Sequence, residues 1–192
     1  MRLRSNTQPL SRRTFIASLA LFQPAPRFLL YDTEGAIHQE SEWAQAKAVV
    51  LFFVTTDCPL SNGYVPEMNR IAREYAPRGV RVYAVLGDIT VPAGEARRHV
   101  REFEYRFPVL FDQHQVLARY TGATVTPEAA VLSPHGQLLY LGRIDNSVER
   151  IGTTRFRPTK FELREALTAT LAGRPVPHPR TTAFGCAISH PE

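Results

Sequence analysis

The sequence is short of several features that mark common protein classes. Its 192 residues include only two cysteines, Cys58 and Cys186, so a disulfide within the chain can join only these two. It has no glycine-rich loop of the kind that cradles phosphates, which argues against a nucleotide or other organic cofactor. No internal repeat is visible, and no apolar run reaches the ~20 residues that cross a bilayer. What remains is room for one well-cored domain with short appendages.

Charge is distributed unevenly along the chain. Five of the 23 basic residues lie before Phe28, where there is no acidic residue, and the other 18 balance 18 acidic residues. The net charge of +5 therefore belongs to the N-terminal segment. A body without excess positive charge argues against nucleic acid as a partner.

Residues 1–27 are predicted to be a leader. The segment Ser11-Arg12-Arg13-Thr14-Phe15-Ile16 resembles a twin-arginine export signal, and a short apolar stretch runs from Phe15 to Phe22. Export would place the protein in the periplasm or another extracytoplasmic compartment, where disulfides persist. The alternative is a basic, unstructured N-terminus on a cytoplasmic protein.

The most informative stretch is a change of period around Cys58. Residues 49–54 form an unbroken apolar run, typical of a strand buried on both faces. From Pro59 onward the apolar residues recur every three or four positions, which predicts a helix. Proline suits the first helical position, so Cys58 is predicted at the helix N-terminus, where unpaired N–H groups and the helix dipole favour a thiolate.

These residues carry a family resemblance. A buried strand, a short turn, Cys58-Pro59-Leu60-Ser61 and a helix containing Pro66 resemble the active-site segment of the thioredoxin superfamily. The match is to its exported redoxin branch, which comprises thioredoxin-like thiol reductases and the alkyl hydroperoxide reductase/thiol-specific antioxidant group. Two positions depart from the thioredoxin pattern, because Ser61 replaces the second cysteine of C-x-x-C and Asp57 stands where a tryptophan is usual.

The resemblance implies an α/β, thioredoxin-like fold: a central mixed β-sheet flanked by helices, with an N-terminal β-hairpin and an extended C-terminal tail. The hairpin falls at residues 28–38, the redoxin domain at 28–174 and a proline-rich tail carrying Cys186 at 175–192. Residues 145–158 lack periodicity and are predicted to leave the core fold. Thr159 and Glu162 have the spacing of a capping box ahead of the last helix.

Thr126-Pro127 lies where thioredoxin-like proteins have their cis-proline loop. By resemblance, Thr126 would present its backbone to an extended, cysteine-bearing partner segment, and Pro127 would keep the surface beside Cys58 open. The alternative is an ordinary trans proline at the entrance to a strand.

The predicted chemistry is that of an exposed, partly ionised sulfur. Helix-terminal N–H groups and the hydroxyl of Ser61 would lower the pKa of Cys58, while the neighbouring carboxylate of Asp57 would oppose ionisation. We therefore expect a moderately lowered pKa. The alternative role for Cys58 is that of a small, buried apolar residue.

The thiol that completes an exchange must come from outside the helix, because position 61 is serine. Cys186 is the candidate resolving cysteine, on a tail whose composition allows it to return over the site. Two alternatives stay open: Cys186 is unrelated to the site or pairs with another chain, or it forms a metal site with His178 or His190. No second pair of ligands at metal spacing is present, so no metal is predicted.

Two enzymatic functions fit the resemblance. Thr55 matches the threonine of the peroxiredoxin P-x-x-x-T-x-x-C pattern, but Leu51 occupies the proline position and Pro127 falls where the peroxide-polarising arginine would lie. Thiol–disulfide exchange with a protein or small-molecule partner is therefore favoured over peroxide reduction. In either case Ser61 and Thr55 are expected to be local hydrogen-bond partners of Cys58. The non-enzymatic alternative is a redox-inert or partner-binding module on the same fold.

Overall fold

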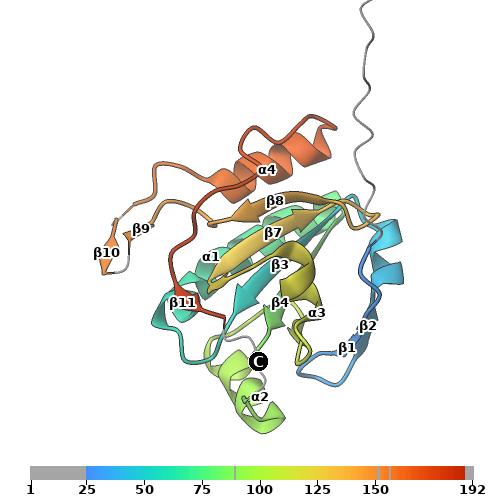
Figure 1. The fold of residues 1–192 in the computed structure, drawn as a ribbon, viewed down its shortest axis with the longest axis vertical. Helices are drawn as coiled ribbons and strands as arrows, with labels where there is room; N and C mark the ends of the chain where they lie inside the picture. Colours follow the sequence, from blue (N-terminus) through green and yellow to red (C-terminus); the bar gives the residue numbers. More distant parts are fainter. Residues whose placement is uncertain (1–24, 89, 151, 156, 189–192) are drawn as a thin grey trace, which may run out of the picture.

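The structure, a computed structural model, describes residues 25–88, 90–150, 152–155 and 157–188 (Figure 1). At its centre is a five-stranded sheet with strand order β5-β4-β3-β7-β8. β3 runs parallel to β4, β4 runs parallel to β5, and β7 is antiparallel to both β3 and β8. The predicted mixed sheet is confirmed. Its strands are β3 (Ala48–Val54), β4 (Val80–Leu86), β5 (Val109–Phe111), β7 (Glu128–Leu132) and β8 (Leu138–Gly142).

β3 is central because both of its faces are apolar. All seven of its residues are buried. Val50 and Phe52 point into one hydrophobic cluster, and Leu51 and Phe53 point into the other, since successive side chains of a strand alternate between faces. Packing on both faces fixes the position of β3, and therefore also the position of the loop that begins at its carboxyl end.

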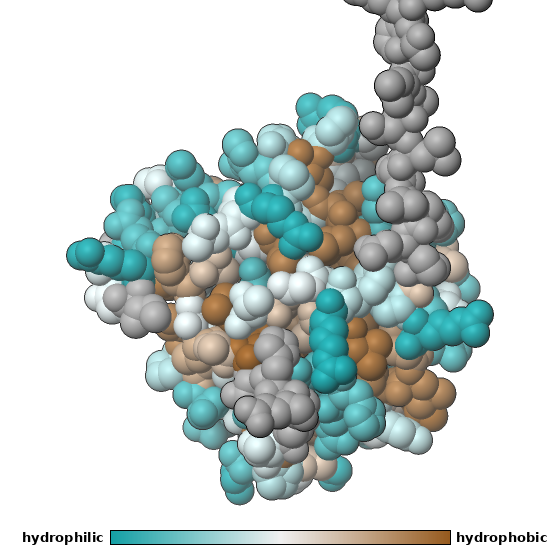
Figure 2. Space-filling model, in the orientation of Figure 1, coloured by the Kyte–Doolittle hydropathy of each residue, from teal (hydrophilic) through white to brown (hydrophobic). Residues whose placement is uncertain are grey.

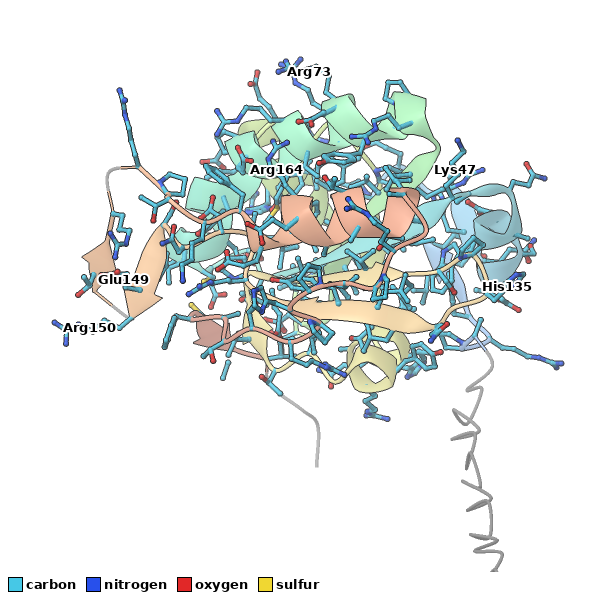
Figure 3. The ribbon with its side chains drawn as sticks, turned by 90° about the horizontal axis from the view of Figure 1, so that it is seen from above. Lys47, Arg73, His135, Glu149, Arg150 and Arg164 are labelled. Carbon is cyan, nitrogen blue, oxygen red and sulfur yellow. The ribbon has the colours of Figure 1, made fainter. Side chains whose placement is uncertain are left out.

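One face of the sheet is covered by α1 (Pro59–Tyr75), α2 (Ala93–Glu102) and α4 (Glu162–Leu171). The apolar stripe predicted for α1 is confirmed, and its Met68 and Ile71 pack with Leu167 of α4 against the sheet. Figure 3 shows α1 and α4 side by side on this face. Arg164 of α4 bridges them, because its guanidinium donates to Glu67 at 2.9 Å and also to Glu74, both on α1.

The other face is covered by the predicted N-terminal hairpin, a 3-10 turn over Glu40–Gln45 and α3 (Val116–Thr121). The hairpin strands are β1 (Leu29–Tyr31) and β2 (Ile37–Gln39). Trp43 of the turn is fully buried against this face. On the outer side of the hairpin, Leu29, Tyr31 and Ile37 are exposed to solvent, and Figure 2 shows apolar surface there.

Residues 145–158 leave the central sheet, as predicted. Within them β9 (Val148–Arg150) and β10 (Thr153–Thr154) pair as a separate two-stranded sheet, at whose outer end Glu149 and Arg150 project in Figure 3. The predicted capping box is wrong, because α4 begins at Glu162 after Phe161. The hydroxyl of Thr159 instead accepts a 3.0 Å hydrogen bond from the amide of Asn146. The polar side chain of Asn146 competes successfully for the group that would have capped the helix.

The predicted tail is extended and lies against the body of the protein. The N–H of Leu141 on β8 donates to the carbonyl of Pro179 at 3.0 Å, and the N–H of Thr181 donates to the carbonyl of Leu141 at 3.1 Å. Further on, β11 (Cys186–Ala187) pairs with β6 (Val125–Thr126). In Figure 1 the red tail passes the edge of β8 and reaches β11 near the carboxyl end of β3.

The predicted leader, residues 1–27, lies outside the described residues apart from its last three. Within the described ranges, no helix combines the length and apolarity needed to cross a membrane. The boundaries of the predicted domain, 28–174, and of the tail, 175–192, stay predictions.

The packing of α4 gives a stability prediction. Leu167→Ala removes a fully buried side chain between α4 and the sheet and should lower the free energy of unfolding by about 2–5 kcal/mol. The matched control is Leu29→Ala, because Leu29 is 58% exposed and its truncation should change that free energy by less than about 0.5 kcal/mol. Urea unfolding followed by circular dichroism measures both. Equal losses in the two variants would contradict the assigned core.

Candidate active site

Cys58 occupies the N-cap of α1, as the sequence predicts. Its backbone is extended, with φ −89° and ψ 109°, and Pro59 is the first helical residue. The first turn of α1 contains no acidic side chain, so no carboxylate of that turn competes for the positive end of the helix dipole. The sulfur therefore lies where a negative charge is favoured.

The expected exposure of Cys58 was wrong. Its relative exposure is 0%, because the C-terminal tail closes over it. Its sulfur nevertheless has polar contacts. The thiol donates to the carbonyl oxygen of Thr126 at 3.2 Å, and Cys58 is part of neither apolar cluster formed by the described residues. A buried sulfur with a polar partner differs from the small apolar residue that was the alternative.

Cys186 lies directly beside Cys58. β11 pairs antiparallel with β6, so that Cys186 is opposite Thr126 and Ala187 is opposite Val125. Both the thiol and the backbone N–H of Cys186 are within hydrogen-bonding reach of the sulfur of Cys58. The structure records both cysteines as free thiols. The tail thus brings the two cysteines together at the backbone of Thr126.

The pKa values of the two thiols are shifted in opposite directions, down for Cys58 and up for Cys186. Burial, the largest influence on Cys58, raises its pKa, but hydrogen bonds from the Cys186 thiol, the Ser61 and Cys186 backbones and the Ser61 hydroxyl hold it below the ordinary value. For Cys186, burial, the hydrogen bond to Cys58 and the negative charges of Cys58 and Asp57 raise the pKa to about 11. Cys58 is therefore the thiol that ionises first, with Cys186 as its hydrogen-bond donor.

Ser61 is fully buried one turn into α1. In the thiol form its hydroxyl has no hydrogen-bond partner among the described residues. Because the same hydroxyl helps to lower the pKa of Cys58, it is a donor that becomes engaged when the sulfur carries a charge. An unpaired buried hydroxyl costs free energy, so this arrangement stabilises the thiolate relative to the thiol.

Thr55 differs from the expectation. Its hydroxyl donates to the carboxylate of Asp57 at 2.9 Å instead of reaching the sulfur of Cys58. Thr55, Asp57 and Cys186 line a cavity of about 120 Å³. The carboxylate that was expected to oppose ionisation of Cys58 therefore acts on Cys186, whose pKa it raises.

The peptide bond between Thr126 and Pro127 is cis, as the resemblance implied. Thr126 is 2% exposed and lies on β6, and Pro127 precedes β7, whose residues pair with β3. Because β3 and β7 are antiparallel neighbours, the loop that follows β3 and carries Cys58 lies at the same end of the sheet as Pro127, which precedes β7. The predicted site residues Cys58, Ser61, Thr126, Pro127 and Cys186 are thereby brought together.

Comparison with known proteins extends these observations. The family model described as the AhpC/TSA family matches residues 21–141. The chain belongs to the AhpC/TSA family. This confirms the family resemblance and, with it, the prediction of a redox enzyme of thioredoxin-like fold. The matched range contains Cys58 and Thr126-Pro127 and ends before the tail that carries Cys186.

Two curated relatives of this AhpC/TSA chain are named thiol-disulfide oxidoreductase ResA. The protein from Geobacillus thermodenitrificans is 30% identical over 122 residues, which cover 63% of this chain and 68% of the relative. The protein from Halalkalibacterium halodurans is 27% identical over 117 residues, 61% of this chain and 65% of that relative. The chain thus spans about two thirds of the length of these relatives.

Solved structures support the same fold. A conserved protein from Geobacillus kaustophilus, described as uncharacterized, superposes with a TM-score of 0.76 at 27% identity, covering 88% of this chain and 91% of that one. A thiol:disulfide interchange protein of the thioredoxin family from Chlorobium tepidum gives a TM-score of 0.55 at 17% identity, with coverage of 77% and 95%. The second similarity shows the fold alone.

Sequence reasoning missed three residues near the AhpC/TSA site. The amide of Asn62 donates to the carbonyl of Thr56 at 3.1 Å and accepts from His99 at 2.8 Å, which ties the loop before Cys58 to α2. Tyr105 has a buried hydroxyl without a partner among the described residues; burial and the charge of Cys58 raise its pKa. The His99–Asn62 contact joins residues 37 positions apart, and Tyr105 is far from Cys58 in the sequence, so no local pattern signals either of them.

The metal alternative for Cys186 has no support in the described part of the chain. No group of three or more His, Cys, Asp or Glu residues arranged to hold a metal ion is found there. His178 lies within that part, whereas His190 lies outside it.

The role of Ser61 gives a titration prediction. Ser61→Ala removes a donor to the thiolate and should raise the pKa of Cys58, so the midpoint of the thiolate absorbance near 240 nm should move to higher pH. Thr168→Ala is the matched control, since its exposed hydroxyl bonds only its own helix at Arg164 and should leave the titration unchanged. An unchanged midpoint in Ser61→Ala would contradict the assigned hydrogen bond.

Stability should follow the same titration. The folded-state pKa of Cys58 is below its unfolded value, so ionisation stabilises the fold above the unfolded pKa, and this contribution is lost as pH falls through the folded pKa. Urea midpoints of the reduced wild-type chain should therefore rise with pH across that window, and the rise should be smaller in Cys58→Ser. Identical pH profiles for the two proteins would contradict the lowered pKa.

Proposed function

We propose that this chain is an exported thiol–disulfide oxidoreductase in which Cys58 is the nucleophile and Cys186 is the resolving cysteine. One observation carries the proposal: the strand pairing of Cys186 with Thr126 holds the second thiol against the first. The names of the curated relatives support the reaction class. Export is supported by the Arg12-Arg13 motif, which lies outside the described residues.

The first step is attack on a disulfide of a protein or small-molecule partner. The tail lifts from the site, and the thiolate of Cys58 attacks one sulfur of the partner disulfide. A mixed disulfide forms at Cys58 as the partner's sulfur–sulfur bond breaks, and the released partner thiolate takes up a proton. The helix N-terminus and Ser61 favour the thiolate that starts this step.

The second step uses Cys186. Its raised pKa depends partly on the hydrogen bond to Cys58 and on the negative charge of Cys58. Both are removed once Cys58 is bound in a mixed disulfide, so the Cys186 thiol becomes a stronger acid when it is needed. Its thiolate attacks the sulfur of Cys58, the Cys58–Cys186 disulfide forms, and the partner leaves with its second sulfur reduced. An external dithiol reductant then returns both cysteines to the thiol state.

The peroxidase alternative lacks a structural counterpart in the described contacts of Cys58. The groups that reach the sulfur are the Thr126 carbonyl, Ser61 and Cys186, and none of these is a cation that would polarise a peroxide. Thr55, which suggested the peroxiredoxin pattern, bonds Asp57 instead. Exchange chemistry accounts for the second cysteine, whereas the partner-binding alternative leaves its placement without a purpose.

Two cysteine variants test the proposal. With a chemical dithiol as the electron source, the wild-type chain should reduce insulin disulfides, and Cys58→Ser should lower the rate to the uncatalysed level. Cys186→Ser should instead accumulate a mixed disulfide with the substrate, visible as a mass adduct on Cys58, because the resolving thiol is gone. Peroxide consumption should stay at the uncatalysed rate in all three proteins.

The outcomes separate the alternatives. Peroxide turnover that is lost in Cys58→Ser would replace exchange by peroxidase chemistry. Insulin reduction that persists in Cys58→Ser would contradict the nucleophile, and a Cys186→Ser variant that turns over without an adduct would contradict the resolving role. Stable capture of a partner without turnover by the wild-type chain would favour the binding module.

A further inference from the structure

The end of the tail occupies the surface where a partner segment would dock. Cys186 and Ala187 form an antiparallel pair with β6, and the N–H of Ile188 donates to the carbonyl of Thr124 at 2.9 Å. These residues add a short strand beside the cis peptide bond at Thr126-Pro127, which is a form of β-strand addition. The chain therefore shows, with its own sequence, what kind of segment fits this surface.

The position before the cysteine is restricted to glycine. A Cβ atom on residue 185 would lie 2.0 Å from the carbonyl oxygen of Thr126 and 2.6 Å from its carbonyl carbon. Both are backbone atoms of a buried residue beside β7, so they cannot move aside as a flexible side chain would. In this register, any other residue at that position clashes with the docking surface.

The two positions after the cysteine differ from each other. Ala187 is exposed, so its side chain meets no restriction, whereas Ile188 packs against the apolar cluster that includes Leu117 and Ala118 of α3. This is the alternation expected of an added strand with one face inward. The pattern that fits is glycine, cysteine, any residue, then an apolar residue.

We propose that the surface at Thr124–Pro127 binds extended protein segments with the pattern Gly-Cys-x-apolar as its substrates, and that residues 185–188 hold it as a tethered competitor. The inference rests on the proposed function, because it identifies the substrate class of the same site. A partner segment binds by taking over the pairing with β6, which also uncovers the sulfur of Cys58.

The end of the tail can leave the site while the part around Thr181 stays attached to the sheet. Upstream, Thr181 is fixed to the sheet: its hydroxyl pairs with that of Tyr140 at 2.7 Å and accepts from the N–H of Arg143 at 3.1 Å. Downstream, β11 has only two residues. The short tether between Thr181 and Gly185 gives the competitor a high effective concentration, on the order of millimolar, so an external segment binds weakly until β11 is dislodged.

The test uses the full-length chain and a seven-residue peptide copying residues 182–188, labelled at its N-terminus, with serine in place of the cysteine. A second peptide carries alanine in place of the glycine. Gly185→Ala in the protein should dislodge β11 by the clash with Thr126, and this variant should bind the glycine peptide at least tenfold more tightly than wild type does. It should also prefer the glycine peptide to the alanine peptide at least tenfold.

Gly94→Ala is the matched control, because a Cβ there meets no atom within 4 Å. It should bind both peptides as wild type does. A second way of releasing the tail is Ile188→Asp, which removes the apolar contact without using the glycine. Both Gly185→Ala and Ile188→Asp should raise the rate of iodoacetamide labelling at Cys58 at least tenfold, with the fold checked by circular dichroism.

Equal affinity for the two peptides in Gly185→Ala and Ile188→Asp would overturn the substrate pattern. Labelling of Cys58 at the wild-type rate in both variants would overturn the tethered competitor. Because the serine peptide cannot take part in exchange, these results do not depend on turnover. If the wild-type chain does not reduce insulin, the proposed function is refuted, whereas the peptide pattern is judged by the binding and labelling results alone.

Discussion

The backbone of Thr126 is the contact on which the site depends. Its carbonyl oxygen accepts the hydrogen bond of the Cys58 thiol at 3.2 Å, and its strand pairing places Cys186 directly opposite. The same oxygen excludes any side chain at position 185. Because β7 follows immediately and pairs with β3, the loop that ends in Cys58 and the strand that carries Thr126 are fixed by one buried sheet.

Charge then distinguishes two otherwise identical side chains. A helix N-terminus and buried donors favour the negative charge on Cys58, while Asp57 and that same charge disfavour ionisation of Cys186. The pair therefore carries one negative charge before it carries two. Ser61 at the second cysteine position of C-x-x-C leaves a hydroxyl donor on the helix in place of a thiol, and in the proposed mechanism the resolving thiol therefore comes from a separate segment.

The sequence predicts much of the fold because its signals are local. The apolar run of β3, the stripe of α1 and the proline after Cys58 each act within a few residues, and the structure contains all three. The cis bond at Pro127 came from family resemblance. Local signals fail where distant groups compete: Asn146 takes the hydroxyl of Thr159, and Cys58 is closed by a tail more than 120 positions away. The short, proline-rich tail has no hydrophobic periodicity from which the strand β11 could have been predicted.

The most direct test of the central claim is peptide mapping of the wild-type chain after mild oxidation, under non-reducing conditions and at low protein concentration. The account predicts one cross-linked pair of peptides, joining Cys58 to Cys186 within the same molecule. Recovery of both cysteines as free thiols, or of cross-links only between molecules, would contradict it.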